Sequence, residues 1–262
     1  MSPWQSLDVE LDAWRAAGRQ PTLWCRDDDA RRDSPALHRL LDVAQAAEVP
    51  VALAAVPATL EQSLVDAVTP AGVATIVQHG WAHRNHAVPP MRSRELGGAR
   101  PVGEVRVELE RGLAVLRVAF GRRFAPILVP PWNRVDDGVV AILPEVGYRG
   151  LSRHGPRAAV MAAPGVVQCN THVDLIAWRH DRKFVGVAGA IDGLAAHLRA
   201  RREGLVDASE PTGVLVHHLD MNEAGWQFLA DVMVRARQRG AIWLDVRTVF
   251  RTPDVAGVTS GR

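Results

Sequence analysis

The sequence predicts an α/β protein whose strands form one parallel sheet, closed or nearly closed into a barrel. Short apolar segments alternate with segments of helical length along the chain. Such alternation is typical of strand–helix–strand units, in which the strands run parallel. The 262 residues have room for about seven such units, which favours a barrel over the competing architecture, an open sheet with helices on both faces.

The expected strands are short apolar runs between turn residues. They cover residues 22–25, 49–55, 73–77, 125–129, 147–151, 213–217 and 241–244, with a weaker piece near 166–169. Between these runs, apolar residues recur every three or four positions, which predicts amphipathic helices. The helices cover residues 4–17, 35–47, 60–68, 105–120, 190–202 and 222–239, with a further helix beginning at Asp136 and a short terminal one.

Cap and turn residues support these boundaries and the domain organisation. Ser34 is placed to cap the helix that follows it, with Pro35 in the first turn. Residues 84–103 are rich in Arg, Gly and Pro, which predicts a long loop. Because no internal repeat or linker divides the chain, we expect a single domain over residues 1–252 and a disordered tail over 253–262.

The composition is that of an ordinary globular protein. The chain is 47% hydrophobic and 23% charged, with a net charge of +2 and no isolated block of Lys or Arg, which argues against a nucleic-acid partner. No run of about 18 apolar residues is present, so we expect no membrane span. Residues 1–20 lack the apolar core of a signal peptide, so the expected location is cytoplasmic.

Two histidines, His79 and His83, follow the expected strand over 73–77. A spacing of four residues places both imidazoles on one face of a helical turn, where two side chains can hold one divalent metal. The strand end is also where α/β proteins place their sites. The competing interpretation is a chance pair on a surface helix.

Three adjacent carboxylates, Asp27, Asp28 and Asp29, follow the first expected strand. Their mutual repulsion is relieved by a cation placed among them, whereas the alternative is an acidic helix start that stabilises the helix dipole. If the two strand ends meet, one Asp joins two His. Three protein ligands with an open fourth position are typical of a catalytic zinc site.

Two further stretches follow expected strands. Pro131 and Trp132 combine a stiff backbone with a flat apolar ring, although a simple turn after the strand explains them equally well. His217 and His218 end a buried run, where a histidine is either a general acid or an interior side chain with a satisfied ring. No nucleophilic Ser or Cys signature and no Gly-rich phosphate loop is present.

Together these stretches resemble the polysaccharide deacetylase family, also called the NodB-homology domain or carbohydrate esterase family 4. The resemblance covers about residues 22–250 and five ordered motifs. In chain order the matching segments are Cys25-Arg26-Asp27-Asp28-Asp29, His79-Gly80-Trp81-Ala82-His83, Val129-Pro130-Pro131-Trp132, Asp174-Leu175-Ile176-Ala177-Trp178 and Leu215-Val216-His217-His218. The resemblance implies an α/β fold, a distorted (β/α)7 barrel with its site at the carboxyl ends of the strands.

The same resemblance implies a set of roles. It makes Asp28, His79 and His83 the ligands of a divalent metal, with zinc preferred and cobalt, nickel or manganese as alternatives. Asp27 becomes the general base and His218 the general acid. The residues expected to contact the substrate are Trp81, Pro131, Trp132, Trp178 and Arg134.

The sequence departs from the family at two tuning positions. Val129 stands where the third motif has Arg, and Ala177 stands where the fourth motif has its second Asp. We expect Arg26 or Arg134 to supply the missing cation. The missing carboxylate would then come from Asp29 or Asp220, while Asp174 keeps the first motif-four position and His217 is the alternative to His218.

The resemblance therefore implies a metal-dependent hydrolase that removes an acetyl group from an N- or O-acetylated sugar. The departures keep two alternatives open. One is a degenerate barrel that binds metal and carbohydrate without catalysis, and the other is a hydrolase of a non-sugar amide. The expected partner is thus an acetylated sugar or another small amide. A scaffold protein with incidental His and Asp residues is the remaining competitor.

Overall fold

A ten-stranded sheet runs through the part of the chain that the structure, a computed structural model, describes: residues 2–179 and 182–252. Its strand order is β6-β7-β5-β4-β3-β2-β1-β9-β8, with β10 also paired to β1. All ladders are parallel except β6–β7. The strands are β1 (Thr22–Ala30), β2 (Val51–Ala55), β3 (Ala74–His79), β4 (Phe124–Val129), β5 (Gly150–Leu151), β6 (Met161–Ala163), β7 (Val166–Gln168), β8 (Val173–Asp174), β9 (Thr212–Val216) and β10 (Ile242–Trp243).

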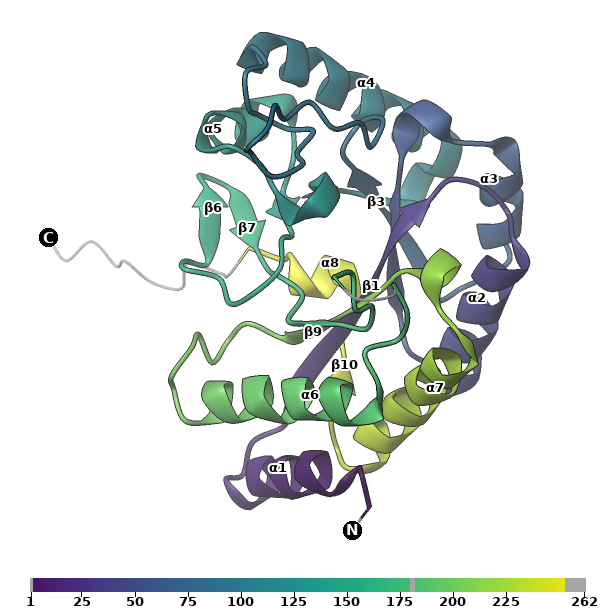
Figure 1. Cartoon of the computed structure of the whole chain (residues 1–262), viewed down its shortest axis with the longest axis vertical. Helices are drawn as coiled ribbons and strands as arrows, with labels where there is room; N and C mark the ends of the chain where they lie inside the picture. Colours follow the sequence, from purple (N-terminus) through teal and green to yellow (C-terminus); the bar gives the residue numbers. More distant parts are fainter. Residues whose placement is uncertain (1, 180–181, 253–262) are drawn as a thin grey trace, which may run out of the picture.

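The longer helices lie around the outside of this sheet (Figure 1). Ser34 caps α2 as expected, since its side chain accepts a hydrogen bond of 3.0 Å from the backbone N–H of Leu37. The α-helices are α1 (Gln5–Ala16), α2 (Pro35–Ala47), α3 (Gln62–Val68), α4 (Val102–Phe120), α5 (Asp137–Val146), α6 (Val187–Arg202), α7 (Glu223–Gln238) and α8 (Val246–Val249).

Buried apolar side chains cover both faces of the sheet. One cluster packs the strands against the outer helices, and a second lies inside the curved sheet together with α8. Successive residues of β1 alternate between them, because Trp24 belongs to the inner cluster and Cys25 to the outer one. Phe250 fills the inner space so closely that a Cβ on Gly150 would lie 2.4 Å from its ring.

The barrel is distorted rather than closed. The sheet path ends at β6 on one side and at β8 on the other. Residues 169–172 connect β7 directly to β8, and a single parallel bridge, His154 to Thr171, is the pairing next to this gap. The predicted α/β barrel class is thus confirmed, with additional short strands at β6 and β8.

The first strand is longer than the apolar pattern indicates. We expected it to end at Cys25, but β1 continues through the acidic residues to Ala30. Charged residues normally argue against a buried strand, and here Arg26, which is fully buried, pairs with Asp28 on the same strand. The acidic cluster therefore belongs to the sheet itself and not to a helix start.

Among the described residues, no helix is both long and apolar enough to cross a membrane. The cytoplasmic location expected from the sequence stays a prediction. The tail predicted over 253–262 lies outside the described residues.

Candidate active site

A cavity of about 780 Å³ opens at the carboxyl ends of the parallel strands. Its lining comes from the carboxyl ends of β1, β3 and β8 and from the segments that follow β3, β4, β5, β8 and β9. This edge is where open and closed α/β sheets place their sites. The titratable side chains that line it are Asp28, Asp29, His79, His83, Arg134, His154, Asp174, Arg179, Arg182 and His217.

Asp29, His79 and His83 form a compact triad in this cavity. The Oδ1 atom of Asp29 lies 3.8 Å from Nε2 of His79 and 3.5 Å from Nε2 of His83. Ligand atoms bound tetrahedrally to one zinc ion are roughly 3.4 Å apart, since each bond is about 2.1 Å. The donor set and its spacing therefore fit a divalent metal.

The two imidazoles are prepared as ligands. Nδ1 of His79 lies 3.0 Å from the carbonyl oxygen of Val129, and a proton donated there leaves Nε2 free with its lone pair. Burial, together with the neighbouring His79, lowers the pKa of His83 to about 4, so this ring is neutral at neutral pH. Burial alone would raise the pKa of Asp29, but the surrounding histidines and Arg31 lower it.

The histidine pair is brought together by a tight turn and not by a helix. Residues 80–83 have no helical structure, and His83 has a φ of +54°. The fully buried carboxylate of Glu95 accepts backbone N–H groups from Trp81 at 3.0 Å, Ala82 at 2.7 Å and Arg84 at 3.3 Å. The helical spacing argument was wrong in its geometry, although the two rings do meet, with centroids 5.1 Å apart.

The structure places Asp29, and not the predicted ligand Asp28, beside the two imidazoles. Asp28 is held by Arg26, whose Nε lies 2.9 Å from Oδ1 and whose Nη2 donates to Oδ2 at 3.0 Å. A register shift in the β1–β2 ladder falls between Asp27 and Ala30, and Asp29 has a φ of +72°. This irregularity turns Asp29 out of the strand alternation and toward the imidazoles.

Arg26 is locked in place by partners from two other strand ends. Its guanidinium donates to the hydroxyl of Ser152 at 2.6 Å and to Oδ1 of Asn133 at 2.7 Å. Of the two arginines expected to supply the missing cation, Arg26 contacts Asp28, while Arg134 donates to the carbonyl of Ser93 at 2.8 Å.

The predicted base and acid, Asp27 and His218, contact each other and not the cavity. Asp27 is fully buried, and its carboxylate accepts the backbone N–H of His218 at 2.8 Å and lies 2.7 Å from Nδ1 of the same residue. Strand alternation explains this, since Asp27 faces outward with Cys25. Burial opposes protonation of His218, but Asp27 outweighs it and raises the pKa of His218.

His217 lines the cavity in place of His218. Its Nδ1 lies 3.8 Å from Oδ1 of Asp174, and its ring packs edge-on against Trp178 at a centroid distance of 4.6 Å. Asp174 is fixed in turn, because its other carboxylate oxygen accepts the indole N–H of Trp178 at 2.7 Å. The fourth and fifth motif segments therefore meet as a carboxylate–imidazole pair.

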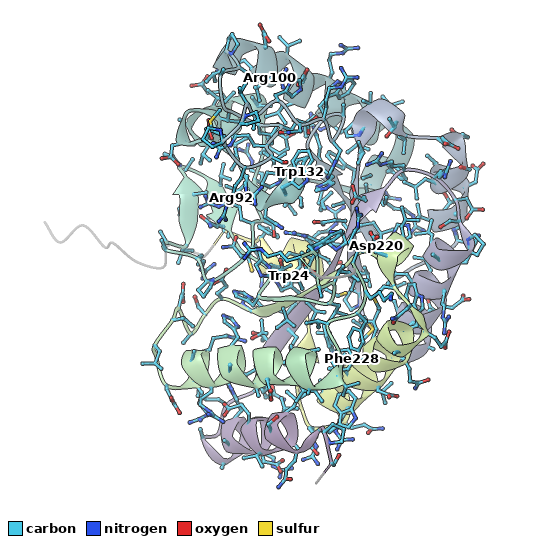
Figure 2. The ribbon with its side chains drawn as sticks, viewed as in Figure 1. Trp24, Arg92, Arg100, Trp132, Asp220 and Phe228 are labelled. Carbon is cyan, nitrogen blue, oxygen red and sulfur yellow. The ribbon has the colours of Figure 1, made fainter. Side chains whose placement is uncertain are left out.

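Of the residues expected to contact substrate, Trp132, Trp178 and Arg134 line the cavity. Figure 2 labels Trp132, which lies between β4 and α5 and whose ring is 4.4 Å from that of His83. Trp81 does not line it, because its ring lies under the guanidinium of Arg111 on α4.

Pro131 and Asp220 do not line the cavity either. Pro131 is buried beneath Gly80, where an added Cβ would lie 2.6 Å from the proline ring. Asp220 pairs with Arg182 at 3.4 Å and so neutralises an arginine that lines the cavity.

Several residues that shape the site were not predicted from the sequence. Glu95 lies alone in an Arg- and Gly-rich loop, and Asn133 and Ser152 matter through Arg26. His154 lines the cavity, with its pKa lowered chiefly by burial. Only Asn133 carries a sequence signal, since it directly follows the Trp132 motif.

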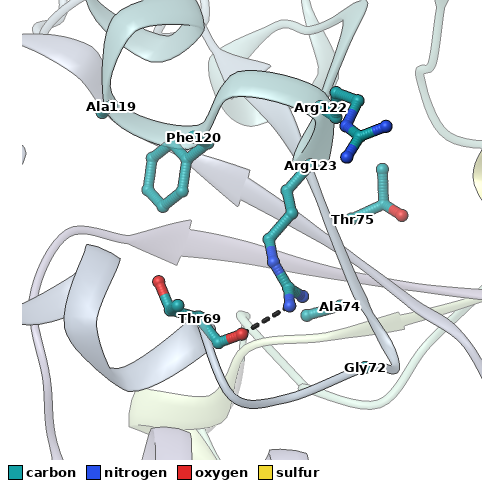
Figure 3. A pocket seen from close by; sticks show the side chains of 8 residues that line it. All are labelled: Thr69, Gly72, Ala74, Thr75, Ala119, Phe120, Arg122 and Arg123. Atoms are coloured by element: carbon teal, nitrogen blue, oxygen red, sulfur yellow. Dashed lines mark hydrogen bonds between the residues drawn. The ribbon is translucent and has the colours of Figure 1, made fainter.

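A second hollow, of about 540 Å³, lies at the opposite edge of the sheet, where β3 and β4 begin (Figure 3). Arg123 donates to the carbonyl oxygens of Thr69 and Ala71, so its guanidinium ties the turn before β3 to the end of α4. The arginine thus serves the packing of this turn.

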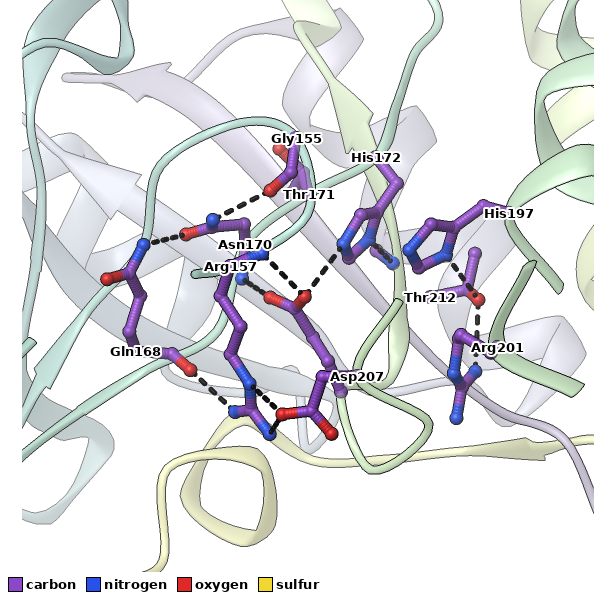
Figure 4. Close-up of polar contacts among 12 residues, drawn as sticks. Gly155, Arg157, Gln168, Asn170, Thr171, His172, His197, Arg201, Asp207 and Thr212 are labelled. Carbon is purple, nitrogen blue, oxygen red and sulfur yellow. Dashed lines mark hydrogen bonds and ion pairs between the residues drawn. The ribbon is translucent and has the colours of Figure 1, made fainter. Parts of the chain in front are cut away.

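A second group of potential metal ligands, His172, His197 and Glu210, is buried beneath β9 (Figure 4). The backbone N–H of Gly213 donates to Nδ1 of His172 at 2.9 Å, so the ring proton of His172 is on Nε2. Nε2 faces Oε2 of Glu210 at 3.3 Å and has no lone pair for an ion. This group belongs to the core, where the Nδ1 atoms of both histidines are hydrogen-bonded and their Nε2 atoms have no hydrogen-bond partner among the described residues.

Comparisons with known proteins agree on the fold. No family model and no curated protein matches the sequence. Among solved structures, a peptidoglycan N-acetylglucosamine deacetylase superposes with a TM-score of 0.58 at 14% identity, covering 89% of each chain. An acetyl xylan esterase of family 4 from Clostridium thermocellum, in complex with a cobalt ion, gives 0.52 at 14% identity, covering 87% of this chain and 90% of the other.

A family 4 pseudoenzyme from Bacillus anthracis gives a TM-score of 0.56 at 12% identity, covering 88% of this chain and 66% of the other. These identities show the fold alone. The chain therefore has the NodB-type barrel of family 4 carbohydrate esterases, as its motifs indicated, and active and inactive proteins share that barrel.

Proposed function

We propose that the protein is a metal-dependent hydrolase that removes an acetyl group from an acetylated sugar by cleaving its carbon–nitrogen bond. One observation carries the proposal. A single cavity is lined by a metal-ligand triad, by a carboxylate held on an arginine and by an imidazole beside a second carboxylate. These are the groups that hydrolysis of an amide requires: a Lewis acid site, a base and an acid.

The metal would be held by Asp29, His79 and His83, with zinc preferred for a set of two imidazoles and one carboxylate. A divalent cation bound there acidifies water and polarises a carbonyl group. The cobalt ion of the structurally similar acetyl xylan esterase supports a divalent metal in this fold.

Asp28 is the proposed general base. Its carboxylate lines the cavity beside Asp29, and the fully buried Arg26 orients it through both oxygens. In the family this arginine comes from the third motif, where Val129 stands here. Arg26 on β1 therefore replaces the missing cation from within the same strand.

His217 is the proposed general acid, which gives a proton to the leaving amine. Asp174 lies beside it, with Oδ1 3.8 Å from Nδ1 of the ring, so a carboxylate adjoins the proposed acid. Trp132 and Trp178 flank the cavity and offer apolar ring faces on which a sugar can stack.

The binding-only alternative rests on Val129, Ala177 and the pseudoenzyme among the structural neighbours. Two pairs weigh against it, because Arg26 holds Asp28 and Asp174 adjoins His217. A non-sugar amide differs from the proposal in substrate only, so a panel of amides separates these two.

The decisive experiment is acetate release by the zinc-loaded protein from N-acetylated and O-acetylated sugars and from simple N-acetyl amides. Asp28→Asn should keep the metal and lower kcat by at least about 100-fold, since an amide cannot accept the proton. The matched control is Asp33→Asn, an exposed carboxylate paired with His38. Metal-loaded protein that releases no acetate from any of these, or full activity in Asp28→Asn, would refute the proposal.

A further inference from the structure

Three arginines, Arg134, Arg179 and Arg182, line the cavity that contains the metal-ligand triad. They come from two segments far apart in the sequence, one after β4 and one after β8. The segment after β8 does not need guanidinium groups to fold there, because the side chains of Arg179 and Arg182 are exposed. Their convergence on one side of a cavity suggests a ligand.

Two of these three arginines, Arg134 and Arg179, are not balanced by acids among the described residues, whereas Arg182 has Asp220 beside it. Arg134 donates to a neutral carbonyl, and Arg179 has neither a hydrogen bond nor an ion pair within residues 2–179 and 182–252. Partial burial, followed by the charges of Arg92, Arg94 and Arg179, lowers the pKa of Arg134, which shows that the guanidinium groups repel one another.

Two nearby arginines differ from Arg134 and Arg179, because an acidic side chain lies beside each of them. Arg94 forms an ion pair with Asp136, and Arg182 has Asp220 at 3.4 Å. Arg92, labelled in Figure 2, has no such partner among the described residues. Uncompensated charge is thus concentrated on Arg134 and Arg179, with Arg92 near Arg134.

The carboxylates of the cavity are already engaged. Asp28 is held by Arg26, and Asp29 lies between the two imidazoles. Asp174 accepts the indole N–H of Trp178 and the backbone N–H of Ile176. None of them is free to neutralise the arginines, and a bound divalent cation would make the cavity more positive still.

We propose that the substrate carries an anionic group, a phosphate or a carboxylate, that Arg134 and Arg179 bind beside the scissile acetyl group. Guanidinium groups suit this task, because their planar donors match both kinds of oxyanion. This inference rests on the proposed function for the acetyl group, whereas the anion-binding step can be measured by itself.

The test compares binding of deacetylated sugars to the zinc-loaded protein by calorimetry at low salt, so that no turnover is required. The probes are glucosamine, glucosamine 6-phosphate, muramic acid and inorganic phosphate. We expect the phosphorylated or the carboxylated sugar to bind at least about tenfold more tightly than glucosamine. Whichever of the two is preferred identifies the anion.

Arg134→Gln and Arg179→Gln should each weaken binding of the preferred anion about tenfold and leave glucosamine binding unchanged. The control is Arg149→Gln, which removes the same charge from an exposed residue just before β5, at the other end of the sheet. It should change neither affinity.

Equal affinity for glucosamine and for the sugars that carry a phosphate or carboxylate group would overturn the inference, as would failure of all the anions to bind. Anion binding that persists in the Arg134→Gln/Arg179→Gln double variant would also overturn it, since the anion would then occupy the metal. Acetate release without any anion preference refutes this inference alone. An anion preference without acetate release from charged or neutral substrates refutes the proposed function instead.

Discussion

At the scale of single residues, the site depends on which of three adjacent carboxylates faces the cavity. Side chains of a strand alternate, so a shift of one residue moves a group to the opposite face of the sheet. Asp28 shares the inner face with Trp24 and Arg26, whereas Asp27 points to the outer core. The bulge then gives Asp29, and not Asp28, to the histidines.

If Asp29 is the metal ligand and Asp28 is not, variants at these two neighbouring positions should differ in their zinc content. Asp29→Asn should weaken zinc binding by more than about tenfold, because it removes the charged ligand of the triad. Asp28→Asn should retain zinc, since its carboxylate is bound to Arg26. Elemental analysis after dialysis against a weak chelator measures both. Loss of zinc from Asp28→Asn with retention in Asp29→Asn would reverse the assignment.

At the scale of elements, the turn after β3 owes its shape to one buried side chain. The carboxylate of Glu95 gathers three backbone N–H groups of the turn that carries His83. Gly80 is required beside it, because a Cβ there would lie 2.0 Å from Oε2 of Glu95. Glu95, at the end of the loop over residues 84–95, thus holds the turn at the beginning of that loop in place.

Glu95→Gln should therefore weaken zinc binding by about tenfold to 100-fold without touching a ligand. The amide keeps one acceptor oxygen but turns an NH₂ group toward backbone donors, which loosens the turn. Competition with a chromophoric chelator measures the affinity. Glu104→Gln, an exposed acid in the first turn of α4, is the matched control. Equal zinc affinity in the two variants would contradict the role of Glu95.

At the scale of the whole molecule, the core group beneath β9 makes stability depend on pH. Burial, followed by the charges of His172 and Arg201, lowers the pKa of His197 to about 2, so the ring is neutral in the folded protein. In the unfolded chain its pKa returns to about 6.5. The stabilisation is complete above pH 6.5 and is lost as the pH falls below that value.

We expect His197 to remove about 2 kcal/mol of unfolding free energy between pH 7 and pH 5. Urea unfolding at the two pH values measures this loss. Between them, His197→Gln should lose about 2 kcal/mol less unfolding free energy than the wild type. His38→Gln, at an exposed histidine paired with Asp33, should keep the full pH dependence of the wild type. Identical pH profiles for wild type and His197→Gln would contradict the expectation.

Sequence patterns predicted the barrel and the meeting of the first and third strand ends, because both follow from apolar runs and from the geometry of parallel strands. They could not select Asp29 over Asp28, since that choice depends on a local irregularity of the β1–β2 ladder. Roles that arise from distant segments, such as those of Glu95 and Arg179, leave no local signal.

The last strand and helix have a consequence for how this chain assembles. β10 pairs with the start of β1, while α8 and Phe250 fill the space between the strand beginnings. The first residues of β1 thus pair only with segments far downstream, Leu23 with Thr212 of β9 on one side and with Trp243 of β10 on the other. Such distant pairing slows folding, so the base of the barrel stays incomplete in a nascent chain until β10 and α8 have been synthesised.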